Sequence, residues 1–469
     1  MQSRRDQVQA YFFVVGRLVA AVTHGKPDTL EVPNRRLNTG TVLGIVIAVV
    51  IAGVFGIVGI FKPGGNTQWQ HEGAIVMNED NGARYVYLQG QLRPVLNYSS
   101  ARLVTGKGGN GQVFSVSQSS LGGIPVGQPI GIPGAPDSLP AAGKLDAGPW
   151  TVCASGEDEP TLTLLLGAAA GAVMTEDLAF LVSTPDDKTY LVWQGKRHKV
   201  PDRDALEALG YGDSRPVPVT AGWLNPIPAG RDLRVPGTQG AGDPGPEIEG
   251  RESVVGQVYE VRNPAINTDQ FYLVRQDGVA PLTTTTAALL LAHPSTQDAY
   301  DGPVAPVVVG PAALRGVPMT SGDDLTKDLP QYPPEVVTPP RESVPCMRFG
   351  PSASGDMHAA AELLPAGMMT TEAVEVPSDT AGSTADRIGV PAGGGVLVRD
   401  LPAPGATPGT AFLVTETGMR YPLAGADVVA ALGYNEAAAV HVPAQLLGLL
   451  PSGPLLSTQA ALQTHASTS

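Results

Sequence analysis

The sequence TVLGIVIAVVIAGVFGIVGIF, residues 41–61, decides how the rest of the chain is arranged. Its 21 residues include no charged side chain and no proline. A helix rises about 1.5 Å per residue, so this stretch matches the roughly 30 Å hydrocarbon core of a bilayer. A buried core helix is rarely apolar on every face over such a length. The stretch therefore predicts a transmembrane helix.

A cleaved signal peptide is the alternative interpretation of this stretch. Signal peptides have an apolar region of about 7–15 residues that ends at a small-residue cleavage site. The stretch is longer than that, begins 40 residues into the chain and continues into Lys62-Pro63-Gly64-Gly65. We therefore expect an uncleaved membrane anchor.

The charges on either side of the span indicate its orientation. Residues 1–40 contain six basic side chains (Arg4, Arg5, Arg17, Lys26, Arg35, Arg36) and three acidic ones (Asp6, Asp28, Glu31). A basic excess in a short flanking segment keeps that segment in the cytoplasm. The whole chain has 30 basic and 44 acidic residues, so the part beyond the span is acidic. We expect a single-pass membrane protein with its N-terminus in the cytoplasm and its bulk outside.

Composition limits the kind of fold and the kind of partner. The roughly 400 residues beyond the span are too many for one compact core and should divide into several units. The 57 glycines and 44 prolines make about a fifth of the chain, and aromatic residues make 5%. This composition favours short strands, turns and long connections. The acidic charge argues against nucleic acid as a partner.

The chain has two cysteines, Cys153 and Cys346, both beyond the predicted span. Disulfides persist outside the cytoplasm, and an even number of cysteines with no other partner favours a bridge between them. In the chain-entropy description, a bridge closing a loop of nearly 200 residues contributes on the order of 4–5 kcal/mol. Two separate buried thiols are the alternative.

Residues 3–22, SRRDQVQAYFFVVGRLVAAV, have the pattern of an amphipathic helix in the cytoplasm, with Ser3 as a candidate N-cap. The apolar side chains that recur at helical spacing are Val8, Tyr11, Phe12, Val15, Leu18, Val19 and Val22. Such a stripe requires a partner helix or the membrane interface. The residues that we expect to make these contacts are Arg4, Arg5, Tyr11, Phe12 and Arg17.

Small residues recur at every fourth position along the span. They are Gly40, Gly44, Ala48, Ala52 and Gly56. On a helix they form one narrow ridge, which would let another helix approach closely. We predict that this ridge packs against a neighbouring transmembrane helix.

Beyond the span the sequence repeats itself. The clearest copies are residues 189–230 and 411–453, and weaker copies begin near residues 84 and 271. Pairs that lie 223 positions apart are Tyr211 and Tyr434, Val219 and Val442, Pro228 and Pro451, and Gly230 and Gly453. Each copy has the pattern of a strand, a polar turn, a strand, a short helix, a Val-rich strand and a final short helix. A unit this small cannot bury its apolar faces alone, so the copies must pack on each other or on a scaffold.

The two inserts between the repeats each contain one cysteine. We therefore predict an α+β protein with an elongated region beyond the membrane, in which four small β-rich repeats lie in pairs on either side of a central disulfide-linked β domain. The expected division is 1–40 cytoplasmic helix and basic linker, 41–61 transmembrane helix, 62–120 linker and first repeat, 121–185 first part of the central domain, 186–235 second repeat, 236–320 linker and third repeat, 321–405 second part of the central domain, 406–456 fourth repeat, and 457–469 C-terminal tail.

The sequence offers no pattern typical of a catalytic site. Gly106-Lys107-Gly108-Gly109 lacks the leading glycine and the hydroxyl residue of a phosphate-binding loop. His71-Glu72 has no second histidine four residues later, and the seven histidines show no metal-ligand spacing. From residue types alone we expect no catalytic, cofactor-binding or metal-binding residues.

Several stretches of the chain resemble the EccB family, a core inner-membrane component of actinobacterial type VII (ESX) secretion systems. They are SRRDQVQAY at residues 3–11, the single span after about 40 residues, residues 82–103, residues 123–140, Trp150-Thr151-Val152-Cys153, and the L-x-x-L-G-Y segments of the repeats. The resemblance covers essentially the whole chain. Gly16-Arg17 departs from the pattern, because the family more often has two basic residues there.

The resemblance implies four periplasmic repeats around a disulfide-linked centre. It also implies assembly with EccC (the motor ATPase), EccD, EccE and often a mycosin protease, in a hexameric complex that exports folded helical-hairpin proteins. The repeats look like a cell-wall-binding subunit of a phage lysin, which suggests contact with peptidoglycan. Family members also carry an ATPase label, with ATP as the implied ligand, although no residue of this sequence supports a nucleotide site. We predict a structural component rather than an enzyme.

Overall fold

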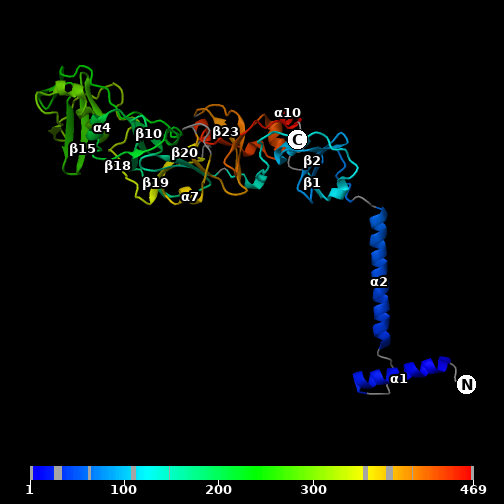
Figure 1. Ribbon diagram of the computed structural model, residues 1–469. Coiled ribbons are helices and arrows are strands. Elements are labelled where there is room, and N and C mark those ends of the chain that lie inside the picture. The colour runs from blue at the N-terminus through cyan, green and yellow to red at the C-terminus, as the bar shows by residue number, and fades with distance from the viewer. Residues whose placement is uncertain are drawn as a thin grey trace. The chain divides into compact units, whose positions relative to one another are not determined.

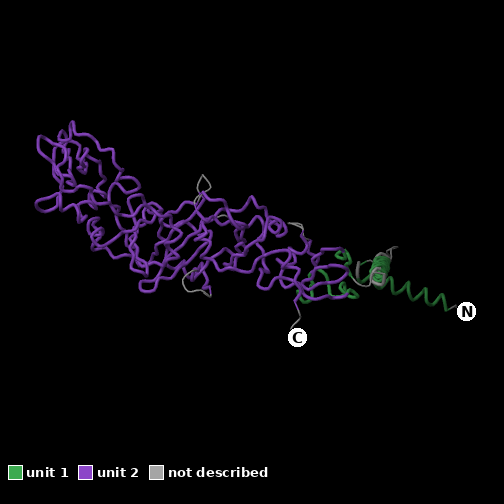
Figure 2. Tube along the Cα trace, turned by 90° about the horizontal axis from the view of Figure 1, so that it is seen from above, with its two compact units in different colours: residues 1–70, 77–82, 115–124 green, residues 71–76, 83–114, 125–469 purple. Residues whose placement is uncertain are grey.

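The computed structural model describes residues 4–25, 34–61, 65–106, 112–146, 148–351, 357–376, 384–403 and 405–465 (Figure 1). The chain divides into two compact units, coloured separately in Figure 2. The first unit comprises residues 1–70, 77–82 and 115–124, and the second comprises residues 71–76, 83–114 and 125–469. The two units are described separately below.

The first unit contains two long helices, α1 (Arg4–His24) and α2 (Asn34–Phe61). Within the described residues, α2 is the one helix that is long and apolar enough to cross a membrane, over Leu37–Ile57, and its side chains there are exposed. The helix begins before residue 41, because no proline lies between positions 33 and 63 and the polar residues from Asn34 onward continue the same helix. Ser3, the expected N-cap of α1, lies outside the described residues.

The second unit is built around a seven-stranded sheet with the order β21-β22-β6-β5-β19-β20-β7. Its strands are β5 (Trp150–Ser155), β6 (Thr161–Leu166), β7 (Ala172–Val173), β19 (Ser343–Pro351), β20 (Met357–Pro365), β21 (Val374–Glu375) and β22 (Arg387–Gly389). All its pairings are antiparallel except that of β22 with β6. The sheet therefore joins two distant parts of the chain, which pair at β5 with β19, at β6 with β22 and at β7 with β20.

Four further sheets share one recurring order of four strands, β3-β2-β1-β4, β10-β9-β8-β11, β16-β15-β14-β17 and β25-β24-β23-β26. The second sheet has β18 as a fifth strand, which pairs with β8. The first contains β1 (Ile75–Asn78), β2 (Arg84–Leu88), β3 (Gln91–Pro94) and β4 (Val113–Val116), and the second contains β8 (Leu178–Ser183), β9 (Thr189–Trp193), β10 (Lys196–Val200) and β11 (Val217–Pro218). The third contains β14 (Val258–Asn263), β15 (Thr268–Arg275), β16 (Gly278–Leu282) and β17 (Val307–Val309), and the fourth contains β23 (Gly395–Leu401), β24 (Ala411–Thr415), β25 (Arg420–Leu423) and β26 (Val440–Pro443). In the last three sheets the fourth strand runs parallel to the first.

Short helices follow the third strand of each of these sheets. They are α3 (Tyr98–Thr105), α4 (Arg203–Ala208), α6 (Thr284–Leu291) and α8 (Ala426–Leu432), and the second and fourth sheets add α5 (Ala221–Leu224) and α9 (Ala444–Leu447). The remaining elements are the hairpin β12 (Pro244–Ile248) and β13 (Arg251–Val254), β18 (Glu335–Val336), α7 (Met368–Thr371), α10 (Thr458–Ala461), and the 3-10 helices η1 (Gln118–Leu121), η2 (Ala142–Lys144), η3 (Pro294–Ala299) and η4 (Glu436–Ala438).

The first strands of the second and fourth sheets, β8 and β23, begin before the repeat units 186–235 and 406–456 expected from the sequence. Strands β8 and β23 belong to the second and fourth sheets, although residues 121–185 and 321–405 were expected to form the central domain. Strands β9 and β24 align 222 positions apart, whereas β8 and β23 begin 217 positions apart, so similarity fades before the hairpin. The sheets therefore begin upstream of residues 186 and 406.

Alternating side chains of β8 face two different cores. Phe180 and Val182 pack into the core of the seven-stranded sheet, whereas Ala179 and Leu181 pack with residues of the third sheet. Because successive strand residues point to opposite faces, one strand joins both cores. The fourth sheet does the same through β23, where Val396 and Val398 face the centre and Leu397 packs with Leu103 of α3.

Candidate functional site

The two cysteines lie at the centre of the second unit. Cys153 on β5 and Cys346 on β19 are paired residues of neighbouring antiparallel strands, and they form a disulfide across a sequence separation of 193 residues. Both are fully buried, beneath a small apolar cluster to which α7 contributes Met369. The bridge therefore links the two halves of the central sheet where they pair.

A buried ion pair lies next to this bridge. Glu362 on β20 is the strand partner of Cys346, and its side chain is completely buried. One carboxylate oxygen accepts a hydrogen bond from the Gly171 N–H at 2.9 Å, and the other lies 3.5 Å from the Arg348 guanidinium. Arg348 also donates to the Ala168 carbonyl at 3.1 Å. The pair therefore fixes the 168–171 loop against the central sheet.

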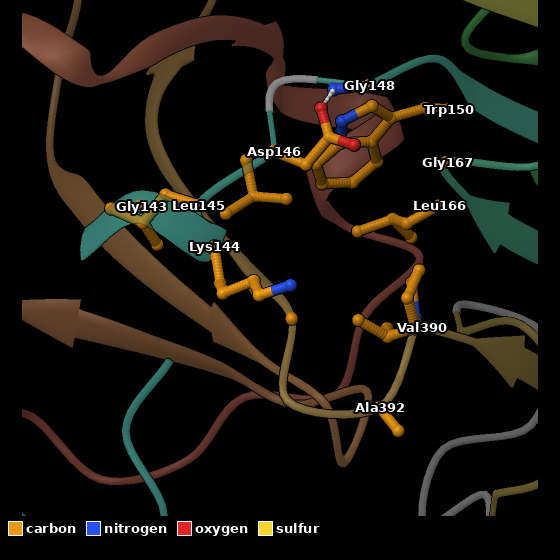
Figure 3. Close-up of a pocket in the computed structure, with 14 residues that line it drawn as sticks. Gly143, Lys144, Leu145, Asp146, Gly148, Trp150, Leu166, Gly167, Val390 and Ala392 are labelled. Atoms are coloured by element: carbon orange, nitrogen blue, oxygen red, sulfur yellow. Dashed lines mark hydrogen bonds between the residues drawn. The ribbon is translucent and has the colours of Figure 1, made fainter. Parts of the chain in front are cut away.

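A cavity of about 440 Å³ opens between the central sheet and the start of β23 (Figure 3). Its apolar lining includes Leu166 and Val390, and the buried Trp150 contributes to the wall. The Lys144 side chain extends into this space from η2. Asp146 accepts a hydrogen bond from the Gly148 N–H at 2.8 Å, which holds its carboxylate at the rim. The cavity therefore combines an apolar wall with both signs of charge.

Two tyrosines 223 positions apart make the same contact. Tyr211 donates its hydroxyl hydrogen to the Pro334 carbonyl at 2.7 Å, and Tyr434 donates to the Pro140 carbonyl at 2.8 Å. Burial raises the pKa of both phenols. In each case the tyrosine ties the end of a short helix to a connecting segment distant in sequence.

The glycine before each tyrosine explains the L-G-Y pattern. Gly210 and Gly433 have φ values of +79° and +94°, in the left-handed region where a side chain is strained. A glycine in this conformation ends the helix and reverses the chain direction, so the tyrosine that follows packs against the end of the helix. In this motif the glycine therefore ends the helix, and the tyrosine hydroxyl then hydrogen-bonds to a distant carbonyl.

Gly230 and Gly453, a second pair of equivalent positions, each pack their backbone closely against an aromatic ring. A Cβ on Gly230 would lie 2.3 Å from the imidazole of His198, and a Cβ on Gly453 would lie 2.3 Å from the ring of Tyr421. The Nδ1 atom of His198 lies 2.8 Å from the Arg231 carbonyl, while its buried Nε2 has no hydrogen-bond partner. Burial lowers the pKa of His198.

The residues expected to contact partners from the cytoplasmic helix all lie on α1. Tyr11 and Phe12 are each 67% exposed, and their rings meet edge to face with centroids 5.9 Å apart. The Arg17 guanidinium lies 5.9 Å from the centre of the Phe13 ring. Arg4 and Arg5 occupy the exposed first turn. The predicted partner contacts of these residues stay predictions.

The small residues of the span lie on α2. Apart from the neighbouring backbone of α2 itself, a Cβ added at Gly40, Gly44 or Gly56 would meet no atom of the described residues within 4 Å. Ala48 and Ala52 are exposed on the same helix. The ridge is therefore open to another helix, and its packing role stays a prediction.

Sequence analysis missed the ion pair and the lining of the cavity. Arg348 and Glu362 stand out as charges inside apolar strands, which is a signal that the sequence did contain. Lys144 and Asp146 lie in a Gly-rich connection and had no such signal. Within the described ranges, no group of three His, Cys, Asp or Glu side chains could hold a metal ion.

Together these features define a class of protein, with one candidate membrane-crossing helix followed by a disulfide-bonded array of small β-sheets. Residues 1–469 match the family described as type VII secretion system ESX-1, transport TM domain B. The chain belongs to this EccB family and is a type VII secretion component.

Named relatives extend along almost the entire chain. The sequence is 32% identical to the ESX-3 secretion system ATPase EccB3 of Mycolicibacterium smegmatis, over 98% of this chain and 90% of the relative. It is 29% identical to the ESX-2 secretion system ATPase EccB2 of Mycobacterium tuberculosis, over 98% of this chain and 94% of the relative.

Solved structures of the family have the same fold. A chain of an intact ESX-5 inner membrane complex superposes with a TM-score of 0.70 and 26% identity, covering 100% of this chain and 97% of the other. A chain of the EccB3 dimer from the ESX-3 core complex superposes with a TM-score of 0.68 and 29% identity, covering 83% of this chain and 100% of the other.

Proposed function

We propose that this protein is a structural inner-membrane component of a type VII secretion machine. The observation that carries the proposal is the match along the full chain to a component of an intact ESX-5 inner membrane complex. Its N-terminus is cytoplasmic and its bulk is periplasmic. The basic charges of residues 1–40 and the disulfide between Cys153 and Cys346 support this orientation.

The partners in this proposal are EccC, EccD and EccE, together with a mycosin protease, and the exported cargo is small helical-hairpin proteins. The chain also associates with further copies of itself through its periplasmic part. A solved relative that is described as a dimer supports this self-association. Helix α1 and the small-residue ridge of α2 supply the contacts inside the cytoplasm and the membrane.

We further propose that the four small sheets are copies of one repeat arranged around a central disulfide-linked domain. Their shared strand order supports this division. The equivalent tyrosines, Tyr211 and Tyr434, and the equivalent glycines, Gly230 and Gly453, support it at the level of single contacts.

Purification of the full-length tagged chain from its own membranes in mild detergent tests the assembly proposal. The expected product is a complex far larger than the 48.4 kDa chain that contains an FtsK-like ATPase. Recovery of the chain only as a monomer would contradict the proposal. Protease added to spheroplasts should remove a tag fused at the C-terminus and leave an N-terminal tag intact. The opposite result would overturn the orientation.

An ATPase is the second candidate function, because relatives of this chain are named as ATPases. The full-length chain, purified free of other nucleotidases, should release no phosphate from ATP above a buffer control if its role is structural. Turnover that coelutes with the chain and scales with its amount would favour the enzyme. Contact with peptidoglycan is tested separately, by cosedimentation of the same chain with the purified polymer.

A further inference from the structure

The cavity lined by Lys144 and Asp146 has no part in the assembly role proposed above. Its volume of about 440 Å³ falls within the range of small-molecule sites, about 300–1,000 Å³. It lies where η2 and the segment that follows it meet β5, β6 and the residues that precede β23. A space of this size could hold an amino acid or a molecule of similar size.

Two opposite charges lie side by side at this cavity. Lys144 and Asp146 flank Leu145, which is extended and forms a parallel bridge with Gly395. Lys144 is the last residue of η2, and Lys144 and Asp146 both line the cavity. No ion pair joins either charge to another side chain in the part of the chain that the structure describes. One Asp146 oxygen accepts the Gly148 N–H, which leaves the second oxygen available to a ligand.

The wall opposite these charges is apolar. Leu166 and Val390 line it, and the Lys144 side chain extends towards them in Figure 3. The indole N–H of Trp150 is buried in this wall without a hydrogen-bond partner. The cavity therefore has a charged side and an apolar side.

Several glycines line the cavity at positions where a side chain would not fit. A Cβ on Gly148 would approach the Cα of Gly167 to 3.2 Å, and a Cβ on Gly395 would approach the Val414 carbonyl to 2.5 Å. Gly167 has φ of +69°, which a larger residue would adopt only under strain. Larger residues at these positions would clash with or strain the walls of the cavity.

We propose that this cavity binds the zwitterion of an aliphatic α-amino acid. The ligand carboxylate pairs with the Lys144 ammonium, and the ligand ammonium pairs with the free oxygen of Asp146. The aliphatic side chain lies against Leu166 and Val390, where burial of its carbon atoms favours leucine over glycine. A simple anion would use Lys144 alone and leave Asp146 and the apolar wall unoccupied.

Calorimetric titration of the full-length chain in detergent micelles at pH 7 tests this assignment. L-Leucine is the probe, and glycine, N-acetyl-L-leucine and L-leucinamide are the matched analogues, which lack the side chain, the ammonium and the carboxylate respectively. L-Leucine should bind at millimolar concentration or better, and each analogue should bind at least tenfold more weakly. Absence of leucine binding at 20 mM, or equal binding of the blocked analogues, overturns the proposal.

Two pairs of variants test whether the charges of Lys144 and Asp146 bind leucine. Lys144→Gln and Asp146→Asn should each weaken leucine binding at least tenfold, whereas Lys196→Gln and Asp158→Asn, at exposed positions outside the cavity, should leave it within twofold. The amide oxygen of asparagine can still accept the Gly148 N–H, so Asp146→Asn keeps the rim folded. Unchanged unfolding midpoints identify folded variants. If folded variants at positions 144 and 146 bind leucine like the wild type, the assignment is wrong, while copurification with the secretion complex would still support the structural role.

Discussion

The hydroxyls of Tyr211 and Tyr434 are the single groups whose removal gives the clearest test of the repeat architecture. Tyr434→Phe and Tyr211→Phe should each lower the free energy of unfolding by about 1–2 kcal/mol, because the buried Pro140 or Pro334 carbonyl loses its donor. The measurement is urea-induced unfolding of the detergent-solubilised chain, followed by tryptophan fluorescence.

The exposed Tyr332 provides the control for this pair. Its side chain is 65% exposed, so Tyr332→Phe should change the free energy of unfolding by less than about 0.5 kcal/mol. Equal changes in the free energy of unfolding at all three positions would mean that the hydroxyl groups of Tyr211 and Tyr434 contribute no stability.

His198 gives the molecule a pH dependence with a definite sign. Burial lowers its pKa from the ordinary 6.5, and Lys196 lowers it further, while the Arg231 carbonyl, Asp232 and Asp328 partly offset this. The unfolded chain therefore takes up the proton first as the pH falls below 6.5, so the free energy of unfolding decreases towards acid. This contribution is fully present above pH 6.5 and is lost as the pH falls towards the lowered pKa.

Stability curves measured between pH 7.5 and pH 5 check this contribution. His198→Asn, whose amide can still donate to the Arg231 carbonyl, should flatten the decrease by up to about 1.4 kcal/mol per pH unit. His441→Asn is the control, because that side chain is exposed. If the free energy of unfolding of His198→Asn decreases with falling pH as steeply as that of the wild type, another titrating group is responsible for the pH dependence.

At this scale, sequence reasoning found the equivalent positions but not their partners. The spacing of 223 between Tyr211 and Tyr434 is visible in the sequence. Their acceptors, Pro334 and Pro140, are 123 and 294 residues away and belong to connections without a repeat pattern. Only the fold brings such pairs together, and the same holds for Lys144 and Asp146 beside Leu166.

At the scale of elements, the small-residue ridge of α2 carries a prediction about association. Gly44→Leu should weaken binding between α2 and its partner helix roughly tenfold, about 1.4 kcal/mol, because the leucine prevents close approach of the two helices. Val46→Leu is the control on the opposite face of the helix. The measurement is energy transfer between labelled full-length chains and the purified partner subunits in nanodiscs. Equal losses in both variants would show that the ridge is not the contact.

Elements that depend on local composition were predicted well. The membrane-crossing helix follows from an uninterrupted apolar stretch, and its N-terminal extension to Asn34 shifts only the boundary. The sequence did not place strands β8 and β23 in the second and fourth sheets. Each strand pairs with a strand on either side and is buried on both faces, so its residues are determined by two cores and not by the repeat pattern. The hairpin β12–β13 has no counterpart among the repeats and was also not predicted.

At the scale of the whole molecule, the bridge between Cys153 and Cys346 is the strongest covalent constraint. Replacing both cysteines by alanine should lower the free energy of unfolding by about 4–5 kcal/mol in the chain-entropy description, because a loop of 193 residues is released. The native chain should also take up no thiol probe until it is denatured and reduced. Labelling of Cys153 in the untreated native protein would contradict the bridge.

The pairing of β5 with β19 has a consequence for how a newly made chain reaches this fold. Ribosomes add about 5–20 residues per second, so Cys346 follows Cys153 by roughly 10–40 s. During that interval the β5–β6 hairpin has no neighbour for its outer edges, although its side chains are destined for the deepest part of the protein. Unpaired apolar edges invite aggregation. The outer edges of this hairpin therefore stay open to aggregation until β19 and β22 have been synthesised.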